Sequence, residues 1–428
     1  MKPLPAAGLR WLESHSNRWP VVPLRFIARM GTGHTPDRSK PNFWEGCTIP
    51  WVTTPDVTSR PQSVKPLMDT QQKISAVGLA NSAAVLHPAG TVMLSRTASV
   101  GFSILIGRPM ATTQAFVTWT PGPLLDSRYL LLVLMAMNQE WDRLAYGSTH
   151  KTIYLPDLES LRVPLPPLEE QRRIADFLDT ETRLLDLVAA SKGSLHGLLR
   201  ERLNAVRNLG LDALREAHGE VPLRRMIRGI EQGSSPLCDS QPADAGEWGV
   251  LKLSSVKRGQ FYPHENKRLT SGAALARYEV REGDLLVTRA NTPDLVGDVA
   301  VARGDVAKRL LPDLVYRLRL SEVVQPDFVA EVLLGGRVRG LIEATARGSS
   351  QSMVKLRGED IRSWPIPKAG IGAQSEFVRR MRLESERVQA LAEAIGRQQQ
   401  VIAERRQALI TAAVTGQIDV TTARGVGV

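Results

Sequence analysis

One long segment, residues 164–210, restricts the possible folds of this chain more than any other. It opens with a proline-rich run, which cannot lie inside a helix because proline lacks an N–H and fixes φ. Apolar residues then recur at alternating steps of four and three, the spacing of a coiled-coil seam. The apolar seam residues are Ile174, Leu178, Leu185, Val188, Leu195, Leu199, Val206 and Leu209. The pattern predicts one long helix over residues 168–213, with Gly210 placed to end it.

A second segment of the same kind follows residues 365–367, where two prolines flank an isoleucine. Its apolar residues recur at a strict interval of seven, at Met381, Val388, Ile395, Ile402 and Leu409. This spacing predicts a second long helix over residues 374–416, which Gly416 ends. A seven-residue repeat in both segments favours left-handed packing of one helix on the other. The alternative is that the two helices are unrelated.

Length, charge and cysteine content narrow the class of protein. The chain has 428 residues, which suggests two to three domains. It carries 55 Lys and Arg against 44 Asp and Glu, and a net charge of +11 is a modest bias toward a polyanion such as nucleic acid. Cys47 and Cys238 lack the neighbours of a zinc site and fit a reducing cytosol. With no apolar run of signal-peptide or membrane-spanning length, we expect a cytoplasmic protein.

The order of motifs in the first half of the chain is repeated in the second half. Pro222 lies 199 residues after Pro23 in matching Val-Pro-Leu-Arg motifs, and the strand-like segment 283–289 lies 193 residues after 90–96. Near-constant offsets of this kind indicate an internal duplication. Because the sequences between the motifs differ strongly, we expect two domains that share a fold and present different surfaces.

Several short motifs are placed in the same order as in a known family. In the first half they are residues 33–36, 49–52, 90–96, 107–114 and 165–171, and in the second half 246–252, 283–291 and 415–419. Together they resemble the specificity subunits of Type I restriction–modification systems, over about residues 19–420. The resemblance implies two target-recognition domains, each followed by a long helix, with the helices packed antiparallel.

We therefore predict an α+β fold with an internal pseudo-twofold duplication. Two similar mixed-β target-recognition domains are joined and spaced by two long antiparallel, coiled-coil-like helices. The predicted order is an N-terminal arm 1–18, the first target-recognition domain 19–167, the first helix 168–213, the second target-recognition domain 219–367, the second helix 374–416 and a C-terminal tail 417–428.

The resemblance also implies the function of a DNA sequence-specificity subunit. Each domain would recognise one half of a bipartite site on double-stranded DNA, and the helices would set the spacer. The implied partners are two modification (methyltransferase) subunits and, in a cleaving complex, ATP-dependent restriction subunits. S-adenosylmethionine, ATP and Mg²⁺ would belong to those partners, with no cofactor, metal site or catalytic residue in this chain.

Motif searches agree with a non-catalytic subunit. The chain has neither a phosphate-binding Gly-x-x-x-x-Gly-Lys-Ser/Thr loop nor a His-Glu-x-x-His motif. Two other functions stay open. One is a duplicated, stand-alone DNA-binding regulator; the other is a metal-dependent nuclease, since Glu265 and Lys267 have the Glu-x-Lys spacing of some such enzymes.

Candidate DNA contacts are polar residues in loops next to strand-like segments. Base readout needs side chains with paired donors and acceptors, and contact with the phosphate backbone needs Lys, Arg, Ser or Thr. In the first half the candidates are Thr53, Thr54, Arg96, Thr113, Gln114, Ser148, His150 and Lys151. In the second half they are Lys252, Ser254, Arg289, Asn291, Thr292, Ser350 and Gln351.

Two groups of candidates carry an explicit alternative. Arg96 and Arg289 end equivalent strands, where each would contact DNA or else form a shared structural salt bridge. Trp44, Trp51 and Trp248 would stack on an unpaired base or, as we expect, anchor the core and its turns.

Overall fold

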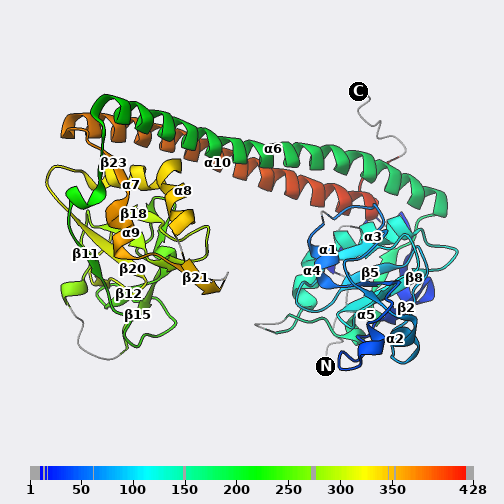
Figure 1. Cartoon of the computed structure of the whole chain (residues 1–428). Coiled ribbons are helices and arrows are strands. Elements are labelled where there is room, and N and C mark those ends of the chain that lie inside the picture. Colours follow the sequence, from blue (N-terminus) through cyan, green and yellow to red (C-terminus); the bar gives the residue numbers. More distant parts are fainter. Residues whose placement is uncertain are drawn as a thin grey trace. The chain divides into compact units, whose positions relative to one another are not determined.

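The computed structural model describes residues 10–420 apart from residues 13, 14, 17, 61, 148–150, 271–275, 346, 351 and 352. Its contacts divide the chain into two compact units. Unit 1 is Met1–Lys192 with Gly396–Val428, and unit 2 is Gly193–Ile395. The two long helices, α6 and α10, contribute residues to both units (Figure 1). Over the described residues, no helix combines the length and the hydrophobicity needed to cross a bilayer.

Unit 1 is built on a four-stranded antiparallel sheet with the order β2-β8-β5-β6. A three-stranded sheet has the order β4-β3-β7, in which β3 and β7 are parallel, and β1 pairs with β9. The strands are β1 (Val21–Pro23), β2 (Ala28–Thr32), β3 (Ile49–Val52), β4 (Lys73–Ile74), β5 (Val92–Ser95), β6 (Ser103–Leu105), β7 (Ala111–Thr112), β8 (Phe116–Pro121) and β9 (Arg162–Pro164). The short helices are α1 (Thr54–Thr58), α2 (Ala76–Ala80), α3 (Ser127–Ala136), α4 (Asn138–Leu144) and α5 (Leu155–Glu159).

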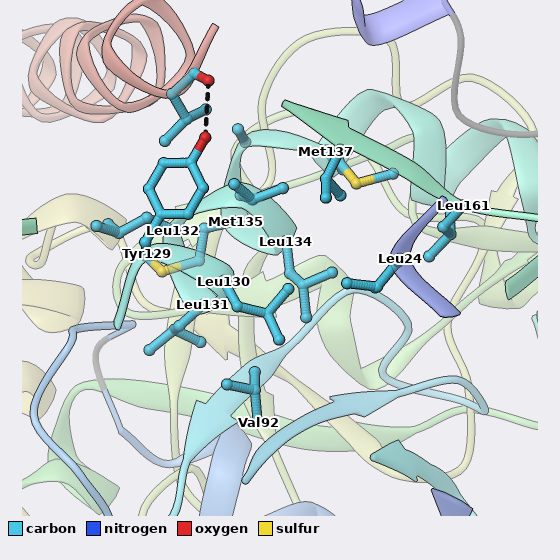
Figure 2. Close-up of a cluster of buried hydrophobic side chains, with 14 of the residues drawn as sticks. Leu24, Val92, Tyr129, Leu130, Leu131, Leu132, Leu134, Met135, Met137 and Leu161 are labelled. Atoms are coloured by element: carbon cyan, nitrogen blue, oxygen red, sulfur yellow. Dashed lines mark hydrogen bonds between the residues drawn. The ribbon is translucent and has the colours of Figure 1, made fainter. Parts of the chain in front are cut away.

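The core of unit 1 lies between α3 and the four-stranded sheet. The Asp126 side chain accepts two backbone N–H groups in the first turn of α3, which suits an N-cap. Figure 2 shows the buried leucines of α3 beside Val92 of β5. The Tyr129 hydroxyl donates to the Val414 carbonyl of α10 at 3.3 Å. Trp11, from the described part of the N-terminal arm, is buried in the same core.

Unit 2 repeats this plan. Its four-stranded antiparallel sheet has the order β11-β20-β16-β18, and its mixed three-stranded sheet β15-β12-β19 contains the parallel pair β12–β19. The strands are β10 (Glu220–Pro222), β11 (Ile227–Gln232), β12 (Gly249–Leu251), β13 (Val256–Lys257), β14 (Gln260–Phe261), β15 (Asn266–Arg268), β16 (Leu285–Thr288), β17 (Ala290–Asn291), β18 (Val299–Val301), β19 (Arg309–Leu310), β20 (Val315–Leu320), β21 (Arg347–Ser350), β22 (Met353–Lys355) and β23 (Pro365–Pro367). The helices are α7 (Pro326–Leu334), α8 (Gly336–Thr345) and α9 (Gly358–Ser363).

The matching sheet orders confirm the predicted α+β fold and its internal duplication. In each four-stranded sheet, the strand that comes first along the chain pairs with the fourth, the fourth with the second, and the second with the third. The pairing of β1 with β9 in unit 1 has its counterpart in β10 with β23 of unit 2. Unit 2 adds strand pairs such as β21–β22, in line with the different sequences between the shared motifs.

The two long helices, α6 (Leu168–His218) and α10 (Ile371–Val414), begin in the same way. Gln171 in α6 and Gln374 in α10 are both fully buried. In each case the side-chain amide donates to two backbone carbonyls, one in the turn before its own helix and one in the loop before α3 or α7. The amide oxygen then accepts a backbone N–H from the same loop. The second helix therefore starts before 374, because Gln374 is already inside its first turn.

Within each unit the two helices run antiparallel. In unit 2, the Arg202 guanidinium of α6 lies 2.9 Å from the Glu384 carboxylate of α10, and further along α6 Gly210 faces the earlier residue Phe377. In unit 1, Asp186 of α6 pairs with Arg406 of α10 at 3.2 Å.

The predicted end of the first helix at Gly210 is wrong. Gly210 lies inside α6, which continues to His218 and is followed by Gly219 with φ of 69°. A Cβ atom at Gly210 would lie 2.7 Å from the Phe377 ring, so the glycine serves close helix packing rather than termination.

The predicted seam holds along α10 but not along α6. All five heptad residues of α10 are buried or half-buried. On α6, Leu195 is 45% exposed and Leu209 is 70% exposed, although both were predicted to face the partner helix. An α-helix with 3.6 residues per turn drifts by about 20° per heptad from a 3.5-residue pattern, so a seam extrapolated over several heptads turns away from the interface.

Candidate nucleic-acid interface

A cavity of about 450 Å³ in unit 1 brings together predicted residues that are far apart in the sequence. Thr53 and Thr54 follow β3, Arg96 follows β5, and Thr113 and Gln114 follow β7. The loops that follow these three strands therefore lie together around one cavity. Thr35, Arg38, Trp51, Pro55, Gln72, Thr97 and Ala115 complete the lining.

Two threonines of this cavity are already engaged. The Thr53 hydroxyl donates to the Asp56 carboxylate at 2.6 Å, and the Thr53 backbone N–H donates to the same oxygen at 2.8 Å. Thr53 therefore caps α1, a short helix where the sequence suggested a polar loop. The Thr113 hydroxyl accepts the Ala115 N–H at 3.2 Å. Both residues shape the rim, and Thr53 is too buried to offer its side chain to a ligand.

Arg96 keeps an unused donor at the cavity. Its backbone is held on both sides, because its N–H donates to Ala115 at 2.9 Å and its carbonyl accepts from Ile153 at 2.8 Å. The guanidinium donates one long hydrogen bond, 3.4 Å, to the Ile153 carbonyl, while its Nε is buried without a partner among the described residues. Buried donors are almost always paired, so the guanidinium is incompletely satisfied by the described residues, and Arg96 lines the cavity in which a ligand would meet it.

Gln114 is exposed, unlike the other predicted residues of this cavity, and its side chain is oriented by Thr35. The Thr35 hydroxyl donates to Gln114 Oε1 at 2.7 Å. The amide nitrogen of Gln114 has no hydrogen-bond partner in the described part of the chain, so both of its donors remain available.

Unit 2 has a cavity of about 640 Å³ at the corresponding place. Lys252 and Ser254 follow β12 as Thr53 and Thr54 follow β3, and both line the cavity. Lys267 and Asp313 also line it, so its wall carries charges of both signs. Burial raises the pKa of the Cys238 thiol in the same wall, which keeps it protonated at neutral pH.

Arg289 matches Arg96 in its backbone contacts. Its N–H donates to Leu314 and its carbonyl accepts from Leu356, both at 2.8 Å. Its Nε donates to the Tyr316 hydroxyl at 3.1 Å, with the guanidinium 5.9 Å from the ring centre. Neither arginine forms an ion pair among the described residues, so the alternative of a shared structural salt bridge gains no support.

Arg289 and the remaining predicted contacts are not part of either cavity lining. Lys151 is exposed and lies 3.3 Å from the Asp142 carboxylate. Asn291, in β17, accepts the Thr292 backbone N–H at 2.9 Å. Ser350 ends β21, where side chains are not described, and Ser148, His150 and Gln351 lie outside the described residues.

The tryptophans near the cavities differ in how deeply they are buried. Trp51 is 1% exposed, its Nε1 donates to the His34 carbonyl at 3.2 Å, and the edge of its ring meets Trp44 at 5.5 Å between centroids. Trp248 is half-buried. For Trp51 the expectation of a core anchor is confirmed.

Sequence reasoning missed several residues of both cavities. Thr35, Arg38, Ser235, Lys267 and Asp313 were not among the predicted contacts. The internal offset was the available signal, since Ser235 lies 200 residues after Thr35 and Asp313 lies 199 residues after Gln114.

Comparison with known proteins finds similarity to one family. Residues 17–195 match the family model described as the Type I restriction modification DNA specificity domain. The specificity subunit of the Type I restriction enzyme EcoEI from Escherichia coli is 31% identical over 144 residues, 33% of this chain and 24% of that protein. Residues 17–195 of this chain are thus similar to the DNA specificity domain of Type I restriction–modification systems.

Further matches extend over more of the specificity subunit. The EcoKI specificity subunit of Escherichia coli K12 is 25% identical over 272 residues, which is 60% of this chain and 56% of that protein. The chain thus aligns with about a quarter to just over half of these curated relatives. A solved chain from a structure of type I restriction–modification assembly has the same fold, with a TM-score of 0.60, 16% identity and coverage of 94% of this chain and 98% of the other.

Proposed function

We propose that this chain is a specificity subunit that recognises a split sequence on double-stranded DNA, one half with each unit. The supporting observation is the pair of equivalent cavities with different linings. Thr35, Gln114 and Arg96 give unit 1 neutral and cationic groups, whereas Lys252, Lys267 and Asp313 give unit 2 charges of both signs. Base pairs differ in their pattern of donors and acceptors, so two similar surfaces with different side chains suit two different half-sites.

In this proposal, α6 and α10 set the number of unread base pairs between the half-sites. Half-sites must keep a defined separation because one turn of B-DNA is roughly 34 Å and a slip of a few base pairs rotates the second site away. A flexible linker would not hold that separation, whereas paired helices resist bending. The antiparallel contacts within each unit, Asp186 with Arg406 and Arg202 with Glu384, support such a role.

The exposed apolar residues of the long helices are the proposed docking surface for two modification subunits. Exposed apolar patches on a soluble protein commonly mark an interface. On α6 these residues are Leu184, Leu187, Val188, Leu195, Leu198 and Leu209, and on α10 they are Ile371, Leu383, Leu391 and Val401. The modification subunits would supply S-adenosylmethionine, and restriction subunits would supply ATP and Mg²⁺ chemistry. This chain then contributes recognition and no catalytic group.

The geometry around Glu265 gives no support to the nuclease alternative. Its carboxylate accepts the Ser254 hydroxyl at 2.7 Å and lies 3.8 Å from the Lys252 ammonium. Within the described residues, no three His, Cys, Asp or Glu side chains gather as a metal-binding group.

Methylation mapping tests the proposal. The chain would be co-expressed with its methyltransferase partner in a host that lacks other adenine methylation, and methylated positions would be located by sequencing. We expect one split motif with a spacer of fixed length. Methylation without a sequence preference would contradict the proposal. Specific binding of the same motif by the chain without its partner would favour the stand-alone regulator instead.

A further inference from the structure

Each unit has a hydrogen-bonded pair of side chains at the equivalent place, and the accepting group is an amide in unit 1 and a carboxylate in unit 2. In unit 1 the Thr35 hydroxyl donates to Gln114 Oε1 at 2.7 Å. In unit 2 the Ser235 hydroxyl donates to Asp313 Oδ1, and the Asp313 N–H points back at the serine oxygen at 3.4 Å. A hydroxyl residue after the first strand of the four-stranded sheet thus orients a polar residue in the loop before β8 or β20.

The backbone around the two pairs is the same. The N–H of His34 donates to the Thr112 carbonyl at 2.9 Å, and that of Ser234 donates to the Leu311 carbonyl at 3.0 Å. The residue before each donor is a glycine. A Cβ atom at Gly33 would lie 2.1 Å from the Thr112 carbonyl oxygen, and one at Gly233 would lie 1.8 Å from the Leu311 carbonyl oxygen. Only glycine permits this approach. The frame that presents Gln114 and Asp313 is therefore shared, and the difference between the units lies in the presented group.

The two presented groups match different bases. With Thr35 occupying one lone pair of Oε1, Gln114 still offers its amide N–H donors together with an acceptor. This combination suits adenine, which presents N7 as an acceptor and N6 as a donor in the major groove. Asp313 offers carboxylate oxygens only, which suit the N4 amino group of cytosine.

The charge at Asp313 also bears on selectivity. A carboxylate beside DNA is repelled by the phosphates, so it favours binding only where a base amino group faces it. Lys252 and Lys267 line the same cavity and offset that repulsion. Gln114 is uncharged and is accompanied by Arg38 and Arg96.

We propose that Gln114 and Asp313 are equivalent specificity-determining residues, with Gln114 selecting adenine in one half-site and Asp313 selecting cytosine in the other. This inference rests on the proposed function, because it assigns bases to the two surfaces already described. Thr35 and Ser235 are positioning residues, since each fixes the orientation of its neighbour.

The test uses the complex of this chain with its methyltransferase and compares Asp313→Asn with the wild type. Asparagine keeps the shape and still accepts from Ser235, but it adds a donor and suits adenine. Methylation rates would be measured on oligonucleotides carrying each base at each position of both half-sites. At one position of one half-site we expect the preference for cytosine over adenine to fall roughly tenfold or more, with the other half-site unchanged.

Asp305→Asn is the matched control, because Asp305 is exposed and is not part of the cavity lining. It removes the same charge and should leave both half-sites unchanged. Gln114→Glu is the reciprocal variant, and it should shift the preference from adenine toward cytosine in the half-site that the Asp313 variant leaves alone.

Unchanged base preferences in an active Asp313→Asn complex would overturn the inference, as would both variants altering the same half-site. A folded, assembled Asp313→Asn complex that binds no DNA would also overturn it, because losing one base contact leaves the phosphate contacts in place. If the Asp313→Asn complex does not assemble, the base preference of the Gln114→Glu complex tests the inference instead. Absence of any split motif in the wild type would instead defeat the proposed function itself.

Discussion

Phe377 of α10 packs directly on Gly210 of α6, where a Cβ would come within 2.7 Å of the ring. The ring is buried and meets Phe328 of α7 edge to face at 6.0 Å, so it is held from both sides. Glycine in a helix interior costs about 1 kcal/mol relative to alanine, and here it allows the two helices and α7 to meet in one core.

We predict that Gly210→Ala destabilises the protein by about 1–3 kcal/mol, because the buried Phe377 ring must shift and overpacking outweighs the gain in helix propensity. Gly197→Ala in the same helix is the matched control. A Cβ there would meet nothing within 4 Å, so this change should stabilise by up to about 1 kcal/mol. Denaturant unfolding of both variants measures the difference, and equal shifts in the same direction would contradict the packing argument.

Tyr129→Phe should weaken unit 1 by about 1–2 kcal/mol. The hydroxyl is fully buried and its single proton is shared between the carbonyls of Pro164 and Val414, whose oxygens lie 3.1 and 3.3 Å away, which ties α3 to β9 and to the last residue of α10. Tyr146→Phe, at an exposed tyrosine, is the control and should have almost no effect.

The Tyr129 contribution should also depend on pH. Burial, and then the Glu170 carboxylate, raise the pKa of Tyr129 well above its ordinary value of 10.0. Because the folded pKa exceeds the unfolded one, the stabilisation is complete below pH 10 and is lost as pH rises above it. Wild type should therefore lose more stability than Tyr129→Phe between pH 8 and pH 11. Parallel losses in the two proteins would argue against this.

Arg96→Gln should lower the affinity of the assembled complex for its DNA site roughly tenfold or more, since it removes a charged donor from the unit 1 cavity. Stability should change little, because the guanidinium makes only one long hydrogen bond within the described part of the chain. Arg108→Gln, at an exposed arginine outside the cavity lining, removes the same charge and serves as the control.

The salt dependence of binding then distinguishes the kind of contact that Arg96 makes. If the slope of log K against log salt falls by about one, the contact is to a phosphate; if the slope is kept and one base preference relaxes, it is to a base edge. Affinity unchanged from wild type would remove Arg96 from the interface.

Deleting one heptad from each long helix, residues 190–196 and 392–398, should shorten the spacer of the methylated motif. Seven residues shorten a helix by about 10 Å, close to three base pairs of B-DNA, and turn it by only about 20°. Methylation mapping would show the new spacing. Alanine substitutions at the exposed positions of the same heptads keep the length and should keep the spacer. A spacer that survives the deletion would rule out the helices as its determinant.

The sequence alone determined the features that depend on local patterns. Heptad spacing located both long helices, proline-rich runs marked their starts, and near-constant offsets showed the duplication. The equivalence of Arg96 and Arg289 also followed, because each comes directly after a buried strand in the same motif. These inferences succeed since helix and strand periods repeat over a few residues of contiguous chain.

Only the tertiary structure decided which side chains meet. Thr35 and Gln114 are 79 residues apart, and Ser235 and Asp313 are 78 apart. Gly210 looked like a helix end until the position of Phe377 was known. Such contacts depend on sheet register and on the packing of helices, where small angular drifts accumulate over many residues. Local sequence cannot fix them, because the free energy that selects them comes from partners distant along the chain.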